Sequence, residues 1–237
     1  MPELKVKFIE SIIRTQTVES FRFQPEGKLV FVPGQFLQFI FDQADINNKD
    51  LNKFLSFSSS PTKDYIEVTK RLSGSAFSQK LRDLKPGDKV LIKAPLGNCV
   101  FKESFHQKIA FLIGGIGITP VISIFEYIAD KSLPVDVNLI YANRVEEEIA
   151  FKKELDSWQK GSKKIKISYI VTECPPKDAT CIFGKVDVNL VRDRLSDIKE
   201  RIVFIFGPPR MVEAMGAICA QLGCDQQNIK KENFIGY

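Results

Sequence analysis

Short apolar runs separated by turn signals dominate residues 1–100 of the chain. The runs are rich in β-branched and aromatic side chains, and Pro25-Glu26-Gly27, Pro33-Gly34 and Pro86-Gly87-Asp88 break them. Six short strands with one helix are typical of a small closed antiparallel barrel. The predicted strands are Leu4–Ile13, Val18–Phe23, Phe36–Phe41, Phe54–Ser59, Tyr65–Arg71 and Lys89–Lys93. The predicted helix covers Ala76–Leu84.

From residue 108 onward, apolar strands alternate with longer helical segments, which is the pattern of a doubly wound parallel sheet. Ligands of such sheets bind beyond the carboxyl ends of the strands. We therefore expect a barrel domain over residues 1–103 and an α/β domain over residues 104–237. The expected strands are Lys108–Ile113, Val135–Tyr141, Ile165–Val171 and Arg201–Phe206, and the expected helices lie near 119–130, 146–159, 187–195 and 209–222.

A glycine cluster follows the first strand of the second half. Gly114, Gly115 and Gly117 precede Thr119-Pro120, which is a typical helix start because threonine caps well and proline suits the first helical position. Without Cβ atoms, the glycines let a ligand approach a positive helix end, so the turn suits a dinucleotide phosphate. The alternative is a turn whose glycines serve chain geometry alone.

Composition limits the chemistry that the chain performs by itself. One histidine, His106, and five cysteines without a Cys-x-x-Cys pair predict neither a metal site nor a hydrolytic arrangement, so we expect a cofactor to carry the chemistry. The net charge of +5 and the dispersed lysines argue against nucleic-acid binding and favour either solubility or an acidic protein partner. Because no apolar run is long enough for a membrane span and the start lacks a signal-peptide profile, a cytoplasmic location is expected.

Several motifs, in order along nearly the whole chain, resemble those of the ferredoxin–NADP reductase superfamily. They are Pro33-Gly34-Gln35-Phe36, the flavin motif at Lys53–Pro61, the turn at Gly74–Ser78, Gly87-Asp88, Pro95-Leu96-Gly97, Gly114–Pro120, Gly207-Pro208-Pro209 with Met211, and Glu232–Tyr237. The resemblance implies a six-stranded antiparallel flavin-binding barrel followed by an α/β NAD(P)-binding domain. It further implies a flavoprotein oxidoreductase that passes hydride from NADH or NADPH to FAD, with FMN as the second choice. The electrons then leave for a separate acceptor such as ferredoxin or flavodoxin, or for a small molecule.

The resemblance also implies roles for individual residues. Ser56 would donate a hydrogen bond to the flavin N5, Glu232 would place a carboxylate near the ring, and Tyr237 would cover its face, so these three are the catalytic candidates. The flavin-binding candidates are Lys53, Phe54, Leu55, Ser56, Val68, Lys70, Gly74, Ser75, Ala76, Phe77, Ser78, Thr119, Phe234 and Tyr237. The NAD(P)H-binding candidates are Gly114, Gly115, Gly117, Thr119, Pro120, Asn143, Arg144, Gly207, Pro208 and Met211. Without the resemblance, Ser75 is a plain helix cap and Glu232 a solvated charge.

Three residues depart from the family pattern. Lys53 stands where arginine is usual, so a bidentate clamp on the flavin pyrophosphate becomes a point charge. Leu55 replaces a tyrosine that lies along the flavin, and Phe206 replaces the cysteine that precedes Gly-Pro-Pro. These changes predict weaker flavin binding. They also leave room for a rival hypothesis, a non-catalytic regulatory or electron-transfer subunit that keeps the reductase fold.

The residues after the second α/β strand bear on the choice of nucleotide. Arg144 suits a 2′-phosphate, whereas the three glutamates at 146–148 would repel that phosphate and suit a free ribose diol. Thr172–Pro175 lacks the Ser-Arg pair often found in relatives that use NADPH. The acidic run also fits the first turn of a helix, where the helix dipole favours negative charge. The balance favours NADH.

Overall fold

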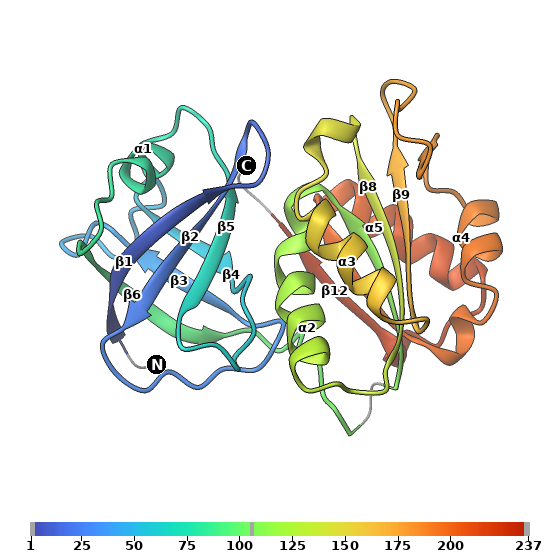
Figure 1. Ribbon diagram of the computed structural model, residues 1–237, viewed down its shortest axis with the longest axis horizontal. Helices are drawn as coiled ribbons and strands as arrows, with labels where there is room; N and C mark the ends of the chain where they lie inside the picture. Colours follow the sequence, from blue (N-terminus) through green and yellow to red (C-terminus); the bar gives the residue numbers. More distant parts are fainter. Residues whose placement is uncertain (1–2, 105–106, 235–237) are drawn as a thin grey trace. The chain divides into compact units, whose positions relative to one another are not determined.

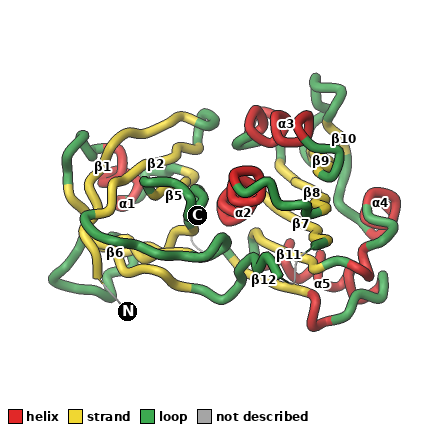
Figure 2. Tube along the Cα trace, turned by 60° about the horizontal axis from the view of Figure 1, so that its bottom comes forward, coloured by secondary structure: helices red, strands yellow, loops and turns green. Residues whose placement is uncertain are grey.

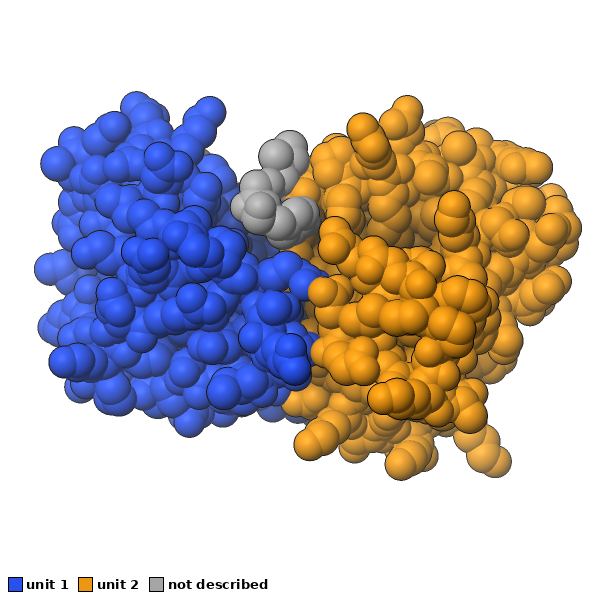
Figure 3. All heavy atoms as spheres, turned by 90° about the horizontal axis from the view of Figure 1, so that it is seen from above, with its two compact units in different colours: residues 1–101, 119–130 blue, residues 102–118, 131–237 orange. Residues whose placement is uncertain are grey.

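The computed structural model describes residues 3–104 and 107–234. By compactness the chain divides into two units, shown in different colours in Figure 3. The first holds residues 1–101 and 119–130, and the second holds residues 102–118 and 131–237. The helix over residues 119–130 is thus grouped with the barrel, although the sequence places it in the α/β half. The domain limits of 1–103 and 104–237 stay a prediction.

The first unit is built on a six-stranded antiparallel sheet with the strand order β4-β3-β6-β1-β2-β5. An isolated antiparallel bridge between Phe57 and Val68 joins the two ends of the sheet, so the sheet curls into the expected barrel. Its elements, labelled in Figure 1, are β1 (Glu3–Ile13), β2 (Val18–Pro25), β3 (Phe36–Ile40), β4 (Asn52–Ser56), β5 (Ile66–Arg71), α1 (Ala76–Arg82) and β6 (Lys89–Leu96).

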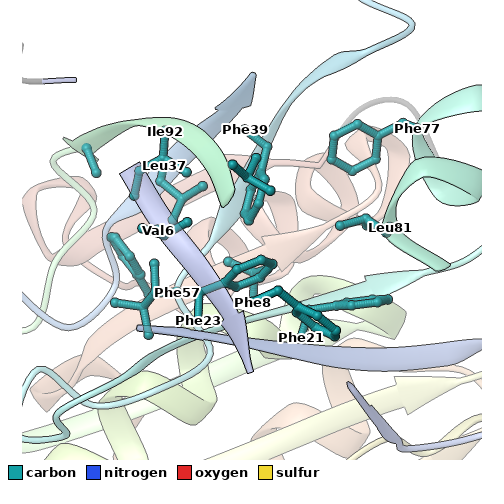
Figure 4. Packing of buried hydrophobic residues seen from close by; sticks show 14 of the residues in the cluster. Val6, Phe8, Phe21, Phe23, Leu37, Phe39, Phe57, Phe77, Leu81 and Ile92 are labelled. Carbon is teal, nitrogen blue, oxygen red and sulfur yellow. The ribbon is translucent and has the colours of Figure 1, made fainter. Parts of the chain in front are cut away.

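Aromatic side chains fill the inside of this barrel (Figure 4). The ring centroids of Phe8 and Phe23 are 5.4 Å apart, and those of Phe23 and Phe39 are 5.1 Å apart. Helix α1 contributes Phe77, whose ring meets Phe39 edge-on at 6.4 Å and Phe41 at 5.3 Å. Burying one such ring contributes about 1.5–3 kcal/mol, so Phe77 anchors the start of α1 to the barrel core.

Helix α2 (Thr119–Asp130) is bonded to the segment that follows β4. The Ser123 hydroxyl donates a hydrogen bond to the carbonyl oxygen of Ser59 at 2.7 Å, and the Ser60 amide donates to the Glu126 carboxylate at 2.6 Å. Lys63 forms an ion pair with Glu126 at 3.4 Å. Burial nevertheless raises the pKa of Glu126. These bonds fix the main chain just beyond β4, in the last part of the Lys53–Pro61 motif.

The second unit holds a six-stranded parallel sheet with the order β10-β9-β8-β7-β11-β12. Because β7 lies between β8 and β11, the strand order reverses there, and the carboxyl ends of β7 and β11 flank the switch point. Helices α4 and α5 pack on one face of the sheet (Figures 1 and 2). The elements are β7 (Lys108–Gly114), β8 (Asp136–Asn143), α3 (Lys152–Gly161), β9 (Ile165–Val171), β10 (Cys181–Phe183), α4 (Val188–Arg194), β11 (Ile202–Gly207), α5 (Pro209–Gln221) and β12 (Ile229–Asn233), with 3₁₀ turns η1 (Gly115–Ile118), η2 (Glu146–Glu148), η3 (Ile198–Glu200) and η4 (Gln226–Asn228).

The fold class is confirmed, and three local predictions are wrong. Strands β10 and β12 were not predicted. The helix expected over residues 146–159 is split into η2 and α3, because Phe151 adopts a left-handed conformation with φ of 60° between them. The helical run after β7 already begins at Gly115, whose φ is 52°, so Thr119 follows a 3₁₀ turn instead of capping a free helix end.

Candidate functional site

The first candidate site lies in the first unit, at the start of α1. The side-chain oxygen of Ser75 accepts a hydrogen bond from the Ser78 amide at 3.3 Å, which is the plain capping that the local sequence predicts. Ser73, absent from the candidates although it lies two residues before the cap, donates to the Ser75 hydroxyl at 3.1 Å. A Cβ atom built on Gly74 would meet no atom within 4 Å, so this turn borders open space. Ala76 begins the helix, and its amide, like the other first amides, has no partner inside the helix.

Two lysines lie near this helix start. Lys53 pairs directly with Phe39 across the β3–β4 ladder, so its side chain is on the same inner face as the Phe39 ring that meets α1. Lys70, on β5, is 7% exposed, and no hydrogen bond or ion pair of either lysine is found among the described residues. Burial, and secondly the charge of Lys53, lower the pKa of Lys70. The described residues leave this positive charge without a neutralising partner.

Strands β4 and β5 place the other residues of the flavin motif. Ser56 is 7% exposed and lies opposite Phe36 on β3. Phe54 is 61% exposed, and its ring meets the Phe36 ring edge-on at 5.9 Å. Leu55 packs partly buried against the barrel core, which includes the fully buried Val68. Leucine therefore fills part of the core where the family has a stacking tyrosine.

The second candidate site lies in the second unit, at the carboxyl ends of β7 and β11. A Cβ atom on Gly114 would overlap the Met211 sulfur, and one on Gly117 would overlap the main-chain carbonyl oxygen of Phe206. Close packing of the turn against the main chain of β11 therefore requires Gly117, and a side chain at Gly114 would displace Met211 of α5, which is the geometric alternative that the sequence left open. At the neighbouring turn after Gly207, Pro208 precedes the first residue of α5. Thr119 and Pro120, which the sequence also assigned to the nucleotide, are both buried at the start of α2.

Asn143 ends β8 with an unsatisfied side chain. It is 5% exposed, and neither its side-chain nitrogen nor its side-chain oxygen has a hydrogen-bond partner among the described residues. Its main-chain oxygen is bonded to the Thr172 amide at 3.1 Å. An unpaired buried polar group costs about 1–3 kcal/mol, so a native protein that keeps one usually has a use for it. Both atoms are sealed from solvent here, so a nucleotide hydroxyl at this edge of the sheet would satisfy them only after the side chain turns outward.

Two acidic side chains form ion-pair or hydrogen-bond contacts in the segment that follows Asn143. The Arg144 guanidinium lies 3.6 Å from the Glu173 carboxylate, and both side chains are largely exposed. Sequence reasoning missed Glu173, since nothing in the spacing of the chain indicates this pairing. The Glu146 carboxylate accepts hydrogen bonds from the amides of Lys177 and Asp178 at 2.7 and 2.9 Å, so it anchors a loop.

Glu232 lies on β12 beside Phe206. It is half-buried, no hydrogen bond or ion pair of it is found among the described residues, and burial raises the pKa of its carboxyl to about 7. The next aromatic residue, Phe234, stacks on Phe206 with ring centroids 6.5 Å apart, and its amide donates to the Gly207 carbonyl at 2.9 Å. Glu232 is therefore not a plain solvated charge. Tyr237 lies outside the described residues.

Among residues 3–104 and 107–234, no helix combines the length and the apolar character that a membrane crossing requires. The same residues contain no group of three or more histidine, cysteine, aspartate or glutamate side chains placed to hold a metal ion.

Comparison with known proteins identifies the family. A family model described as an oxidoreductase FAD-binding domain matches residues 3–101, and one described as an oxidoreductase NAD-binding domain matches residues 111–216. NADH-cytochrome b5 reductase 1 of Dictyostelium discoideum is 28% identical over 232 residues, which span 96% of this chain and 79% of that protein. These matches support a reductase and give no support to a non-catalytic subunit.

Two solved structures share the whole fold. The FAD/NAD-binding domain of a nitric oxide dioxygenase from Vibrio cholerae gives a TM-score of 0.83 at 19% identity, with 98% of each chain covered. A ferredoxin NADP+ reductase from Neisseria gonorrhoeae, solved with FAD and NADP, gives a TM-score of 0.81 at 20% identity, with 98% of this chain and 99% of that chain covered. The chain belongs to the ferredoxin–NADP reductase superfamily and is an NAD(P)H-dependent flavin oxidoreductase that binds FAD.

Proposed function

We propose that NADH is the hydride donor of this enzyme, and that a separate one-electron carrier of the cytochrome b5 class receives the electrons from FAD. The observation that carries the choice of donor is the ion pair between Arg144 and Glu173. Because Glu173 neutralises the arginine that a 2′-phosphate would need, the free ribose diol of NADH is the better ligand. The relative named NADH-cytochrome b5 reductase supports both donor and acceptor. The net charge of +5 supports an acidic acceptor, with ferredoxin or flavodoxin as the second candidates.

For the flavin, the residues around α1 fit an anionic group. Lys53, Lys70 and the open turn at Gly74 would receive the diphosphate of FAD, and the amides of Ala76 and Phe77 at the start of α1 would add donors. Ser56 would donate its hydroxyl hydrogen to the flavin N5. Bound FAD supplies the hydride-accepting chemistry, and the protein supplies position and electrostatics.

For the nicotinamide nucleotide, the carboxyl edge of the parallel sheet is the proposed site. The turn at Gly114–Gly117 would lie along the diphosphate, and the turn at Gly207-Pro208 with Met211 would border the nicotinamide half. The side-chain amide of Asn143 lacks a partner among the described residues and, once turned outward from its sealed position, would donate to and accept from a ribose hydroxyl. The Asn143 side chain has no hydrogen-bond partner among the described residues, and the two turns lie at the switch point of the sheet.

Glu232 is the proposed proton-holding group. A carboxyl whose pKa is about 7 exchanges its proton readily at neutral pH, which is the property required of a general acid or base. The Phe206 ring lies opposite Glu232 on β11, the Phe234 ring that stacks on it directly follows β12, and the two rings would exclude water from the carboxyl. Cover of the flavin face by Tyr237 stays a prediction.

Steady-state reduction of purified acceptors tests this proposal. The enzyme is supplied with NADH or NADPH and with oxidised cytochrome b5, ferredoxin or flavodoxin, and the rate is followed at the absorbance of each acceptor. We expect NADH with cytochrome b5 to give the highest kcat/KM, and the rate to fall as salt screens the acidic partner. A higher kcat/KM with NADPH would contradict the choice of donor, and preference for another carrier would contradict the choice of acceptor.

A further inference from the structure

The β9–β10 loop, residues 172–180, begins beside the end of β8, and Figure 1 shows β8 and β9 as neighbouring strands. The amides of Thr172 and Glu173 donate hydrogen bonds to the main-chain oxygen of Arg144 at 3.2 and 2.9 Å. These bonds extend the pairing of the two strands and place Glu173 beside Arg144, where the side chains form the ion pair at 3.6 Å. Both side chains are largely exposed, so their contact depends on where the main chain holds them.

Glu146 holds the other half of the β9–β10 loop. Its Oε2 atom accepts hydrogen bonds from the amides of both Lys177 and Asp178, at 2.7 and 2.9 Å. Hydrogen bonds to an ionised carboxylate are roughly twice as strong as those between neutral groups. Glu146 is half-buried, whereas its neighbour Glu147 is exposed. The Glu146 carboxylate is therefore engaged by the loop, whereas the sequence suggested repulsion of a 2′-phosphate as the role of the acidic run.

An ion pair attaches the same part of the loop to α3. The Lys152 ammonium lies 3.0 Å from the Asp178 carboxylate and 2.8 Å from that of Asp156. Asp178 also accepts a hydrogen bond from the Thr180 amide at 2.8 Å. The loop is thus attached at residues 172–173 and again at residues 177–178, both times to the segment that follows β8.

Two prolines connect these attachments. The rings of Pro175 and Pro176 fix φ at about −65°, and each proline restricts the residue before it to extended conformations. A proline-rich segment is a semi-rigid spacer, so a displacement at Lys177 is transmitted to Glu173 instead of being absorbed between them. The hydrogen bonds of Glu146 therefore fix the direction in which the main chain leaves Glu173.

We infer that Glu146 is a positioning residue for the choice of nucleotide: by holding the β9–β10 loop, it keeps the Glu173 carboxylate on Arg144. The inference rests on the proposed function, in which that ion pair favours NADH. Glu146 acts here through two main-chain amides, and its charge does not act on the nucleotide directly. Repulsion and positioning differ in their consequences, because repulsion needs only the charge and positioning needs only an acceptor oxygen at this place.

Variants that separate the charge of Glu146 from its acceptor oxygen test the inference. Glu146→Ala removes both, Glu146→Gln keeps the oxygen, and Glu147→Ala is the control that removes a neighbouring exposed charge. Glu173→Gln, alone and combined with Glu146→Ala, shows whether the two residues act together. For each protein, kcat and KM are measured with NADH and with NADPH, with ferricyanide as the electron acceptor, and urea unfolding reports the stability.

We expect Glu146→Ala to raise the NADPH/NADH ratio of kcat/KM about threefold, through a lower KM for NADPH and with kcat unchanged. Glu146→Gln and Glu147→Ala should keep the wild-type ratio. The double variant should match Glu173→Gln, because without the ion pair the position of the loop no longer affects Arg144. Should Glu146→Ala fail to fold, Lys177→Pro removes one of the donor amides instead, and Lys177→Ala, which keeps that amide, is its control.

A ratio that rises equally in Glu146→Gln and Glu147→Ala would show repulsion by charge and overturn the inference. An unchanged ratio in Glu146→Ala, or a double variant whose ratio exceeds that of Glu173→Gln, would overturn it as well. A wild type that prefers NADPH, or a Glu173→Gln variant with the wild-type ratio, would contradict the proposed function instead. The two failures are therefore distinguishable, since only the second involves proteins in which Glu146 is intact.

Discussion

Replacement of Glu232 by glutamine should change how the stability of the protein depends on pH. Burial raises the pKa of the Glu232 carboxyl from its ordinary 4.5 to about 7, because no described cation or donor compensates its charge. Below pH 4.5 the folded and unfolded states both hold the proton. Between pH 4.5 and 7 the folded state keeps a proton that the unfolded state has lost, so the free energy of unfolding falls as the pH rises.

The size of this effect follows from the same two values. The difference between 4.5 and about 7 corresponds to about 3 kcal/mol, which the wild type loses between pH 4.5 and pH 8. Glutamine does not titrate, so Glu232→Gln should lack this loss. Relative to wild type, the variant should therefore gain up to about 3 kcal/mol over that range and be flat above pH 8.

Urea unfolding from pH 4.5 to pH 9 measures the effect, with Glu213→Gln as the control because Glu213 is an exposed carboxyl on α5. The control should follow the wild-type profile throughout. If the profiles of Glu232→Gln and wild type ran parallel, Glu232 would titrate as an ordinary surface carboxyl. The proposed proton-holding role would then be wrong.

Three further substitutions probe the nucleotide site. Gly117→Ala should destabilise the protein by about 3 kcal/mol, because its Cβ would overlap a main-chain carbonyl, whereas Gly114→Ala should cost about 1 kcal/mol since the flexible Met211 can move aside. Equal losses in urea unfolding would contradict this packing argument. Glu173→Gln should free Arg144 and raise the NADPH/NADH ratio of kcat/KM about fivefold, and an unchanged ratio would rule out the ion pair as the basis of nucleotide choice.

Much of the fold follows from local sequence signals. The strand expected over Ile165–Val171 has those bounds in the structure, because its β-branched and aromatic residues, interrupted only by Lys166 and Ser168, suit a strand of the parallel sheet. Strand β12, Ile229–Asn233, was missed because its sequence is polar, and its pairing depends on β11 instead of on its own side chains. The break before α3 depends on the left-handed conformation of Phe151, for which an aromatic residue gives no signal.

The sequence predicts where the candidate sites lie along the chain. It predicts less well how buried their side chains are, which partners they have and how their pKa values shift. The glycine turn and the Ser75 cap follow from residue type and spacing. That Lys70 and the Asn143 side chain lack partners among the described residues, and that the pKa of Glu232 is raised, arises from burial by strands far apart in sequence, which spacing does not reveal. The sequence alone therefore predicts least well which polar and charged side chains are buried.

An anaerobic visible spectrum of the purified protein with FAD, recorded before and after addition of NADH or NADPH, tests the central claim most directly. The account predicts flavin absorption bands that are lost on addition of NADH, and lost more slowly with NADPH. A protein that takes up no FAD would contradict the flavin site. Bound flavin that neither nucleotide reduces would contradict the oxidoreductase function itself.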